Sequence, residues 1–201
     1  MKKLILTLCM LAISLTFYGQ KIILDKMEND SIRVIESENI MKRKFTDTVI
    51  WNYGIKSYHN INTNETLYML MINLNATTPI TIKKDGKFLI KLFNGEIIEL
   101  NTFETVYNDV TLGYSYQRSI VGNIGVIKRN KVTRNIATFV VTKEELSKLN
   151  EGINKVRVET ALGYLQREYK KDDIGMRLFQ AYINIQETLE NKQSPTMYDS
   201  F

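Results

Sequence analysis

The sequence predicts a mainly β, α+β fold, in which an antiparallel β meander or sandwich-like sheet or sheets is combined with two C-terminal helices. The first observation is a series of short runs rich in Ile, Leu and Phe that are separated by turn dipeptides. The second is an alternation of charged and apolar residues over 155–160, as in a strand with one buried face. The third is a pair of helix signals in the last third of the chain.

The turn dipeptides are clearest in residues 79–101, PITIKKDGKFLIKLFNGEIIELN. Asp85-Gly86 and Asn94-Gly95 are typical of two-residue type I′ turns, which join adjacent antiparallel strands. This segment therefore predicts a three-stranded meander of residues 79–84, 87–93 and 96–101.

Other strands are predicted from apolar and β-branched content. They cover residues 31–44, 49–58, 67–75, 114–128 and 135–141, and for the first of them a helix is left open. Gly122 and Gly125 indicate a bend or bulge within residues 114–128.

The first helix is predicted in VTKEELSKLNEG, directly after the last of these strands. Thr142 and Glu145 have the spacing of a capping box, and Val141 and Leu146 that of a hydrophobic staple. Gly152 is a suitable stop.

The second helix is predicted to begin near Asp172 or Asp173, which suit a helix N-terminus. Its apolar residues recur at helical spacing and form a stripe wide enough to lie against a sheet. They are Ile174, Met176, Leu178, Phe179, Tyr182, Ile183, Ile185 and Leu189.

Between the helices, residues 153–175, INKVRVETALGYLQREYKKDDIG, predict a hairpin with its turn at Leu162-Gly163. The predicted cross-strand pairs are Glu159 with Gln166, Arg157 with Glu168, and Lys155 with Lys170 and, diagonally, Glu168. Such pairs contribute roughly 0.2–1 kcal/mol each on an exposed sheet face. The charges therefore indicate the solvated side of a sheet, with a ligand site as the less favoured alternative.

The same region resembles known proteins. The capped helix, the INKVRVET strand, the GY…REYKKDDIG return and the closing helix resemble segments of small secreted, β-rich bacterial proteins without assigned function. The resemblance is confined to the C-terminal part of the chain and includes no catalytic motif. It implies export and a β-rich fold but no activity.

Residues 1–19 predict a signal peptide, because a basic head, MKK, precedes an apolar run over residues 4–18. This run is too short to span a bilayer, which takes about 20 residues, and no other segment comes close. The predicted cut is Gly19–Gln20, and cuts after Thr16 or after Gln20 are alternatives. Lipid attachment at Cys9 is disfavoured because half of the apolar run would remain on the mature protein.

We expect export to the periplasm, cell surface or extracellular space of a Gram-negative-type bacterium. Residues 20–192 are predicted to form one β-rich domain and residues 193–201 a polar tail. Without Lys2 and Lys3, the chain has 25 basic and 22 acidic residues, a net charge of +3. That charge is too small to indicate a nucleic-acid partner.

No catalytic residue, metal site or cofactor is predicted. His59 is the only histidine, and it has neither a G-x-S-x-G motif nor further Cys or His ligands to work with. The glycines and cations of VGNIGVIKRNK fit no phosphate-binding motif and predict a basic loop on a twisted hairpin. A hydrolase built on two carboxylates remains the alternative function, because such pairs converge in space and not in sequence.

The candidate ligand-binding residues are mainly aromatic. Trp51 and Tyr53 share one face of a predicted strand, as do Tyr114 and Tyr116, with Arg118 continuing the second row. Flat rings beside a polar group suit a sugar or an extended peptide, whereas core tyrosines give the same pattern and are the more common case. We expect an exported, non-catalytic binding or envelope-associated module with a glycan, peptide or protein partner.

Overall fold

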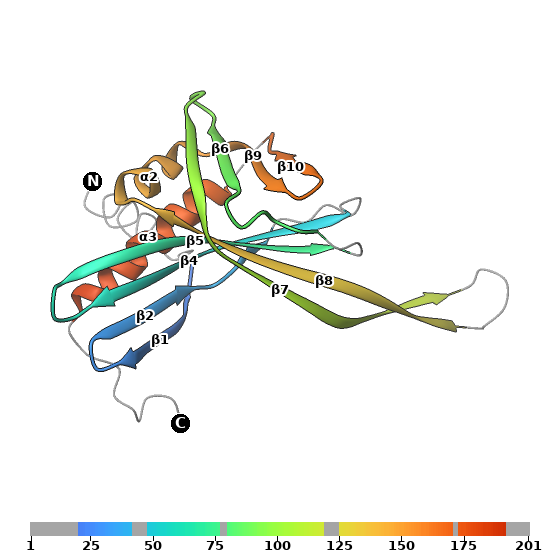
Figure 1. Cartoon of the computed structure of the whole chain (residues 1–201), viewed down its shortest axis with the longest axis horizontal. Coiled ribbons are helices and arrows are strands. Elements are labelled where there is room, and N and C mark those ends of the chain that lie inside the picture. The colour runs from blue at the N-terminus through green and yellow to red at the C-terminus, as the bar shows by residue number, and fades with distance from the viewer. Residues whose placement is uncertain (1–19, 42–47, 77–79, 119–124, 171–172, 192–201) are drawn as a thin grey trace, which may run out of the picture.

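The computed structural model describes residues 20–41, 48–76, 80–118, 125–170 and 173–191, and over residues 106–132 the description is of the backbone. The predicted signal peptide and polar tail lie outside these residues. The fold class is confirmed: the protein is mostly antiparallel β-sheet with two helices near the C-terminus (Figure 1). Within the described residues, no helix is both long and apolar enough to cross a membrane.

The strands form a ten-stranded sheet with the order β1-β2-β4-β5-β8-β7-β6-β9-β10, and β3 pairs with β4. The first five strands are β1 (Ile22–Asn29), β2 (Ile32–Ser37), β3 (Ile40–Met41), β4 (Val49–Asn60) and β5 (Glu65–Ala76). The next three are β6 (Lys87–Leu92), β7 (Ile97–Arg118) and β8 (Gly125–Val141). After them come α2 (Lys143–Lys148), the 3₁₀ turn η1 (Leu149–Glu151), β9 (Ile153–Thr160), β10 (Gly163–Glu168) and α3 (Ile174–Glu190).

Strand β7 links the two parts of the sheet. Its first five residues pair with β6, whereas from Thr102 onward it pairs with β8, with a register shift between Thr102 and Glu104. The two parts share one core, in which Phe88 of β6 lies against Phe139 of β8 with ring centroids 5.2 Å apart. Strands β6 and β9 bury one face and leave the other exposed or half-buried, and β10, at the edge, has exposed and half-buried residues.

Helix α3 completes the core by packing against β1 to β4. Most of the predicted apolar stripe is buried or packed against the core, and the Tyr182 ring meets Tyr68 edge-on at 5.3 Å. Met176 is 56% exposed and is not part of that stripe. The helix begins after Asp173, as predicted, but without a side-chain capping bond, and Asp172 lies outside the described residues.

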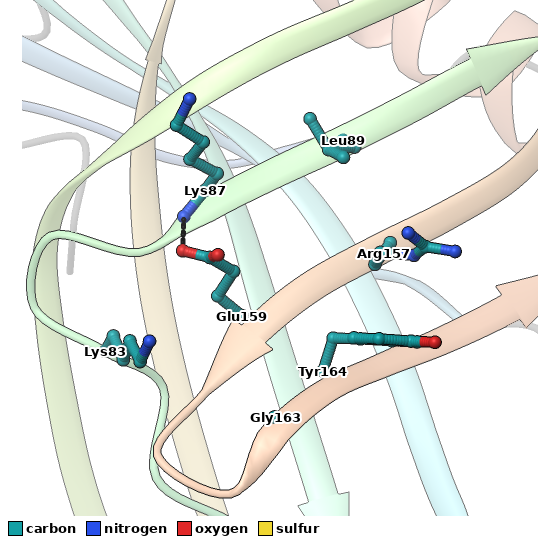
Figure 2. Close-up of a pocket in the computed structure, with 7 residues that line it drawn as sticks. All are labelled: Lys83, Lys87, Leu89, Arg157, Glu159, Gly163 and Tyr164. Carbon is teal, nitrogen blue, oxygen red and sulfur yellow. Dashed lines mark hydrogen bonds between the residues drawn. The ribbon is translucent and has the colours of Figure 1, made fainter.

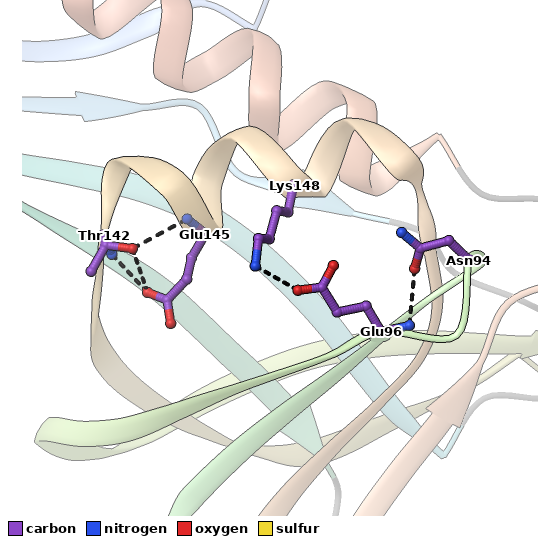
Figure 3. A network of polar contacts seen from close by, with 5 residues as sticks. All are labelled: Asn94, Glu96, Thr142, Glu145 and Lys148. Atoms are coloured by element: carbon purple, nitrogen blue, oxygen red, sulfur yellow. Dashed lines mark hydrogen bonds and ion pairs between the residues drawn. The ribbon is translucent and has the colours of Figure 1, made fainter.

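The capping box of α2 is confirmed (Figure 3). Thr142 Oγ1 accepts from the Glu145 backbone N–H at 3.2 Å, and Glu145 Oε2 accepts from the Thr142 backbone N–H at 2.8 Å. Lys148, at the end of this helix, pairs with Glu96 beside the β6–β7 turn at 2.5 Å. Asn94 accepts from the Glu96 N–H at 2.9 Å, so the helix and the turn are held together.

The predicted meander is half right. The Asn94-Gly95 turn joins β6 to β7 as predicted, with Gly95 at a φ of 93°. The Asp85-Gly86 prediction is wrong, because β9, and not the preceding segment, pairs with the other edge of β6. In β9, Val156 and Val158 are opposite the buried residues Ile90 and Phe88 of β6. The described residues 80–84 contain two lysines and form one isolated bridge, from Ile82 to Thr160.

The predicted hairpin exists, but its register is shifted. The turn residues are Ala161 and Leu162, which place Lys155 opposite Glu168 and Arg157 opposite Gln166. The faces are nevertheless as predicted, because a change of two residues in the pairing keeps every side chain on its side of the sheet.

Three other strand predictions are corrected. β1 was not predicted, residues 31–44 contain β2 and β3 in place of one strand or a helix, and the predicted strand 114–128 is divided between β7 and β8. Those two strands form a hairpin, and residues 119–124, which join them and include Gly122, lie outside the described residues.

Gln20 ties the start of β1 to α3. Its carbonyl oxygen accepts from Asn184 Nδ2 at 2.7 Å. When the side-chain amide is oriented by its partners, its oxygen accepts from Arg177 Nη2 at 2.7 Å and its nitrogen donates to the Glu38 carbonyl at 3.1 Å. Gln20 is 5% exposed. Signal-peptide cleavage before Gln20 would keep these hydrogen bonds, and cleavage after Gln20 would remove them.

Replacing Gln20 with alanine is expected to lower the free energy of unfolding by about 1.5 kcal/mol, because partly buried donors and an acceptor lose their partners. Urea unfolding of the chain beginning at Gln20 measures this. The neighbouring Lys21→Ala change, at an exposed side chain, is the control and should stay within about 0.5 kcal/mol of the parent. Equal losses of unfolding free energy in the two variants would contradict a stabilising role for the Gln20 side chain.

Candidate functional site

The candidate site is a shallow pocket of about 270 Å³ on the exposed face of β6, β9 and β10 (Figure 2). It is lined by Lys83, Lys87, Leu89, Arg157, Glu159, Gly163 and Tyr164. The strand alternation explains its composition, because the intervening residues Phe88, Val156 and Val158 are buried in the core. The charged face predicted for the hairpin is therefore one wall of the pocket, and β6 supplies the other.

A stacked pair forms the β9–β10 side of the pocket. The Arg157 guanidinium lies over the Tyr164 ring, 4.3 Å from its centroid. Arg157 Nη2 also donates to Gln166 Oε1 at 3.2 Å, which orients the guanidinium plane. Tyr164 remains 59% exposed, so part of an aromatic surface is available to a ligand beside a fixed cation.

Glu159 lies beside this pair, two residues from Arg157 on β9 and opposite Tyr164 in the β9–β10 register. Its Oε2 accepts from the Lys87 backbone N–H at 3.1 Å, and its backbone carbonyl accepts from the Lys83 N–H at 3.3 Å (Figure 2). The Lys87 ammonium group pairs with Glu99 at 2.5 Å, and this hydrogen bond and charge raise the pKa of Lys87. Lys83 has no side-chain ion pair within the described part of the chain, so its ammonium group is available.

The pocket thus combines three cationic donors, one carboxylate and one aromatic ring. Hydroxyl groups can donate to Glu159 and accept from the cations, and a flat apolar ligand face can lie on Tyr164. Most glycoside hydrolases use two carboxyl groups, about 5–9.5 Å apart. Among the described residues that line the pocket, Glu159 carries a carboxylate, and Glu99 lies next to the lining as the partner of Lys87.

The predicted aromatic rows have different positions in the fold. Trp51 and Tyr53 are 3% and 1% exposed, with ring centroids 6.3 Å apart, and the Tyr53 hydroxyl is 2.7 Å from the Tyr169 hydroxyl. These two rings are core residues, which was one of the two hypotheses for them.

The second row lies elsewhere, on β7. Tyr114, Tyr116 and Arg118 are opposite Arg129, Ile127 and Gly125 of β8, and their side chains lie outside the description. The fold therefore does not join the two rows into one platform.

His59 is a strand-end residue, as predicted. It is close to the end of β4, and its Nδ1 is 2.9 Å from Thr66 Oγ1. Burial and the positive charge of Arg33 lower the pKa of His59, so the ring is mainly neutral at pH 7. Among the described residues, no three His, Cys, Asp or Glu side chains are grouped to hold a metal ion.

Several pocket residues were missed by sequence reasoning. Arg157 and Glu159 were identified, but as part of a solvated face, whereas Lys83, Lys87 and Tyr164 were not connected with them. The missing information was the pairing of β6 with β9, which joins residues about seventy positions apart in the chain. The alternation of charges on both strands was the signal that could have suggested a shared face.

No family model, curated protein or solved structure matches this chain. The function is therefore inferred from the chemistry of the pocket.

Proposed function

We propose that this protein is an exported, non-catalytic binding module that holds a saccharide unit in the pocket between β6, β9 and β10. The observation that carries the proposal is the stacked Arg157–Tyr164 pair beside the carboxylate of Glu159 in a pocket of about 270 Å³. Pockets for drug-sized ligands occupy roughly 300–1,000 Å³, so this smaller pocket suits one sugar ring. The predicted signal peptide supports a place in the periplasm or at the cell surface.

A saccharide fits this surface better than a peptide side chain or a protein. Protein partners are anchored mainly by large side chains in well-packed, desolvated pockets. Here the only aliphatic side chain in the lining is Leu89, and the remaining side chains are charged or phenolic. Sugars present hydroxyl groups that both donate and accept, together with a flat C–H face, and these match Glu159, the cations and Tyr164.

The test is a panel of soluble oligosaccharides titrated into the chain from Gln20 onward and followed by calorimetry. Tyr164→Ala is expected to weaken binding about tenfold, or ~1.4 kcal/mol. The matched control is Tyr58→Ala, because Tyr58 also lies beneath a cation, with Lys56 Nζ 4.7 Å from its ring centroid, but on β4. This control should bind like the parent protein.

Two results would overturn the proposal. The first is a failure of every oligosaccharide to bind, or equal affinity of the Tyr164→Ala and parent proteins. The second is turnover of a bound glycan that is abolished by Glu159→Gln, which would replace the binding module with the hydrolase.

A further inference from the structure

Strands β7 and β8 leave the sheet as a two-stranded arm (Figure 1). β5 pairs with β8 only as far as Thr133, and within the described residues β8 beyond that point pairs with β7 alone. The arm consists of residues 110–118 and 125–132, from the Val110–Val132 pair to the Arg118–Gly125 pair. Eight residue steps at ~3.4 Å give it a length of roughly 27 Å.

An isolated two-stranded ribbon is marginally stable in water, because its backbone is paired on one side only and it has no core of its own. The β7–β8 ribbon is also interrupted by a register shift between Val110 and Gly113. An element of this kind gains order when it lies against a partner.

The charge of the arm is unlike that of the rest of the molecule. Its residues include Arg118, Lys128, Arg129 and Lys131, and none is acidic. The other residues from Gln20 onward contain 21 basic and 22 acidic side chains, a net charge of −1. The entire net positive charge of the exported chain is thus concentrated in one projecting ribbon.

Aromatic and cationic residues occupy positions of the same face of this ribbon. Tyr114, Tyr116 and Arg118 occupy alternate positions of β7, and Arg129 is opposite Tyr114 in the register. Alternate positions of a strand belong to one face, so these four residues hold register positions of the same face. Lys128 is next to Arg129 in sequence and belongs to the other face, which leaves neither face free of charge.

We propose that the arm is a docking element for an acidic polysaccharide. The cations are distributed over the length of the ribbon, which suits a polymer with repeated negative groups better than a single small anion. The tyrosine positions suit sugar rings. An element that enters a bilayer interface needs a wide apolar face, which the placement of cations on both faces does not provide. The proposal rests on the proposed function for its saccharide partner and narrows that partner to an acidic one.

The experiment compares two variants of the chain from Gln20 onward that lose the same four positive charges. The arm variant is R118Q/K128Q/R129Q/K131Q, and the body variant is K26Q/K84Q/K143Q/K170Q, at four exposed lysines. Binding to immobilised polygalacturonate is measured at 50 and 200 mM salt, with neutral dextran, vesicles of phosphatidylglycerol and phosphatidylcholine, and duplex DNA as competing surfaces. Circular dichroism confirms that both variants are folded.

The parent and body variant are expected to bind polygalacturonate with a similar affinity that falls steeply with salt, because bound counterions are released. The arm variant is expected to bind at least about tenfold more weakly and with a shallower salt dependence. Dextran should not bind through the arm.

An equal loss of polygalacturonate affinity in the arm and body variants would mean that binding depends on net charge alone, and it would overturn the proposal. Preferred binding to vesicles or to DNA would overturn it in favour of a different partner. The Tyr164→Ala variant separates the two sites: if it keeps its attachment to polygalacturonate while the arm variant loses it, the arm proposal stands whatever the outcome for the pocket. If polygalacturonate binding depends on Tyr164 and not on the arm, the arm proposal fails and the pocket proposal stands.

Discussion

Replacing Gly175 with alanine is expected to lower the free energy of unfolding by about 2 kcal/mol. A Cβ atom at this position would lie 2.4 Å from the Leu149 carbonyl oxygen, 3.0 Å from the Gly152 Cα and 3.2 Å from the Ile153 Cγ1. Two of these atoms belong to the backbone, so no side chain can turn away to relieve the contact. Overpacking costs about 3 kcal/mol at the upper end of its usual range, and the better helix propensity of alanine returns ~1 kcal/mol.

The measurement is urea unfolding, with Met176→Ala as the control on the same helix. Met176 is 56% exposed, and its replacement should change stability by no more than about 0.5 kcal/mol. A Gly175→Ala protein that is as stable as the parent would mean that α3 lies farther from η1 than the structure places it. The close packing at Gly175 also concerns the pocket. Ile153, whose Cγ1 would be 3.2 Å from the added Cβ, is the first residue of β9, and β9 supplies Arg157 and Glu159 to the pocket.

The features that the sequence predicted well are determined by neighbouring residues. The capping box of Thr142 and Glu145 and the Asn94-Gly95 turn each depend on fewer than five consecutive residues. The apolar stripe of α3 depends on a period that is visible within one helix. These elements were therefore predicted nearly to the residue, although Met176 shows that apolar character alone does not establish burial.

The partner of β6 and the composition of the pocket were missed because they depend on pairing between distant segments. Nothing local to residues 79–84 excludes them as the partner of β6, because that choice depends on the competing buried row of β9. The same pairing creates the pocket. The sequence therefore identified Arg157 and Glu159 but did not connect them with the pocket residues of the β6 segment. Trp51 and Tyr53 pose a different problem, since a core strand and an exposed platform place rings at the same alternate positions.

Asp25→Asn is expected to cost about 3 kcal/mol, because it leaves a buried guanidinium group without its counter-charge. Arg33 donates from Nε and Nη2 to the two carboxylate oxygens of Asp25 at 2.8 and 2.7 Å. The Arg33 side chain is 7% exposed and that of Asp25 is 24% exposed. Breaking a buried pair by removing one partner costs 3–5 kcal/mol, and the partial exposure of Asp25 places this pair at the low end.

The double variant Asp25→Leu/Arg33→Met separates two contributions to stability: the destabilisation by an unpaired buried charge and the net stabilisation by the ion pair. It should be more stable than Asp25→Asn, because no charge is left buried in it. If the two proteins unfold at the same urea concentration, Arg33 is solvated in the folded state and the pair is not a buried one.

His59 provides an independent probe of the same cluster, because it is the only histidine and is opposite Arg33 in the β2–β4 register. The positive charge of Arg33 already contributes to lowering the pKa of His59. Asp25→Asn removes the compensating negative charge and should lower the pKa of His59 further, whereas the double variant removes Arg33 and should raise it toward the ordinary value of about 6.5. NMR follows the single imidazole signal as the pH falls. Opposite shifts of the pKa in the two variants would show that the charge of Arg33 acts on His59 and that Asp25 offsets it. Shifts in the same direction would mean that a change in the burial of the ring, and not the charge of Arg33, controls its protonation.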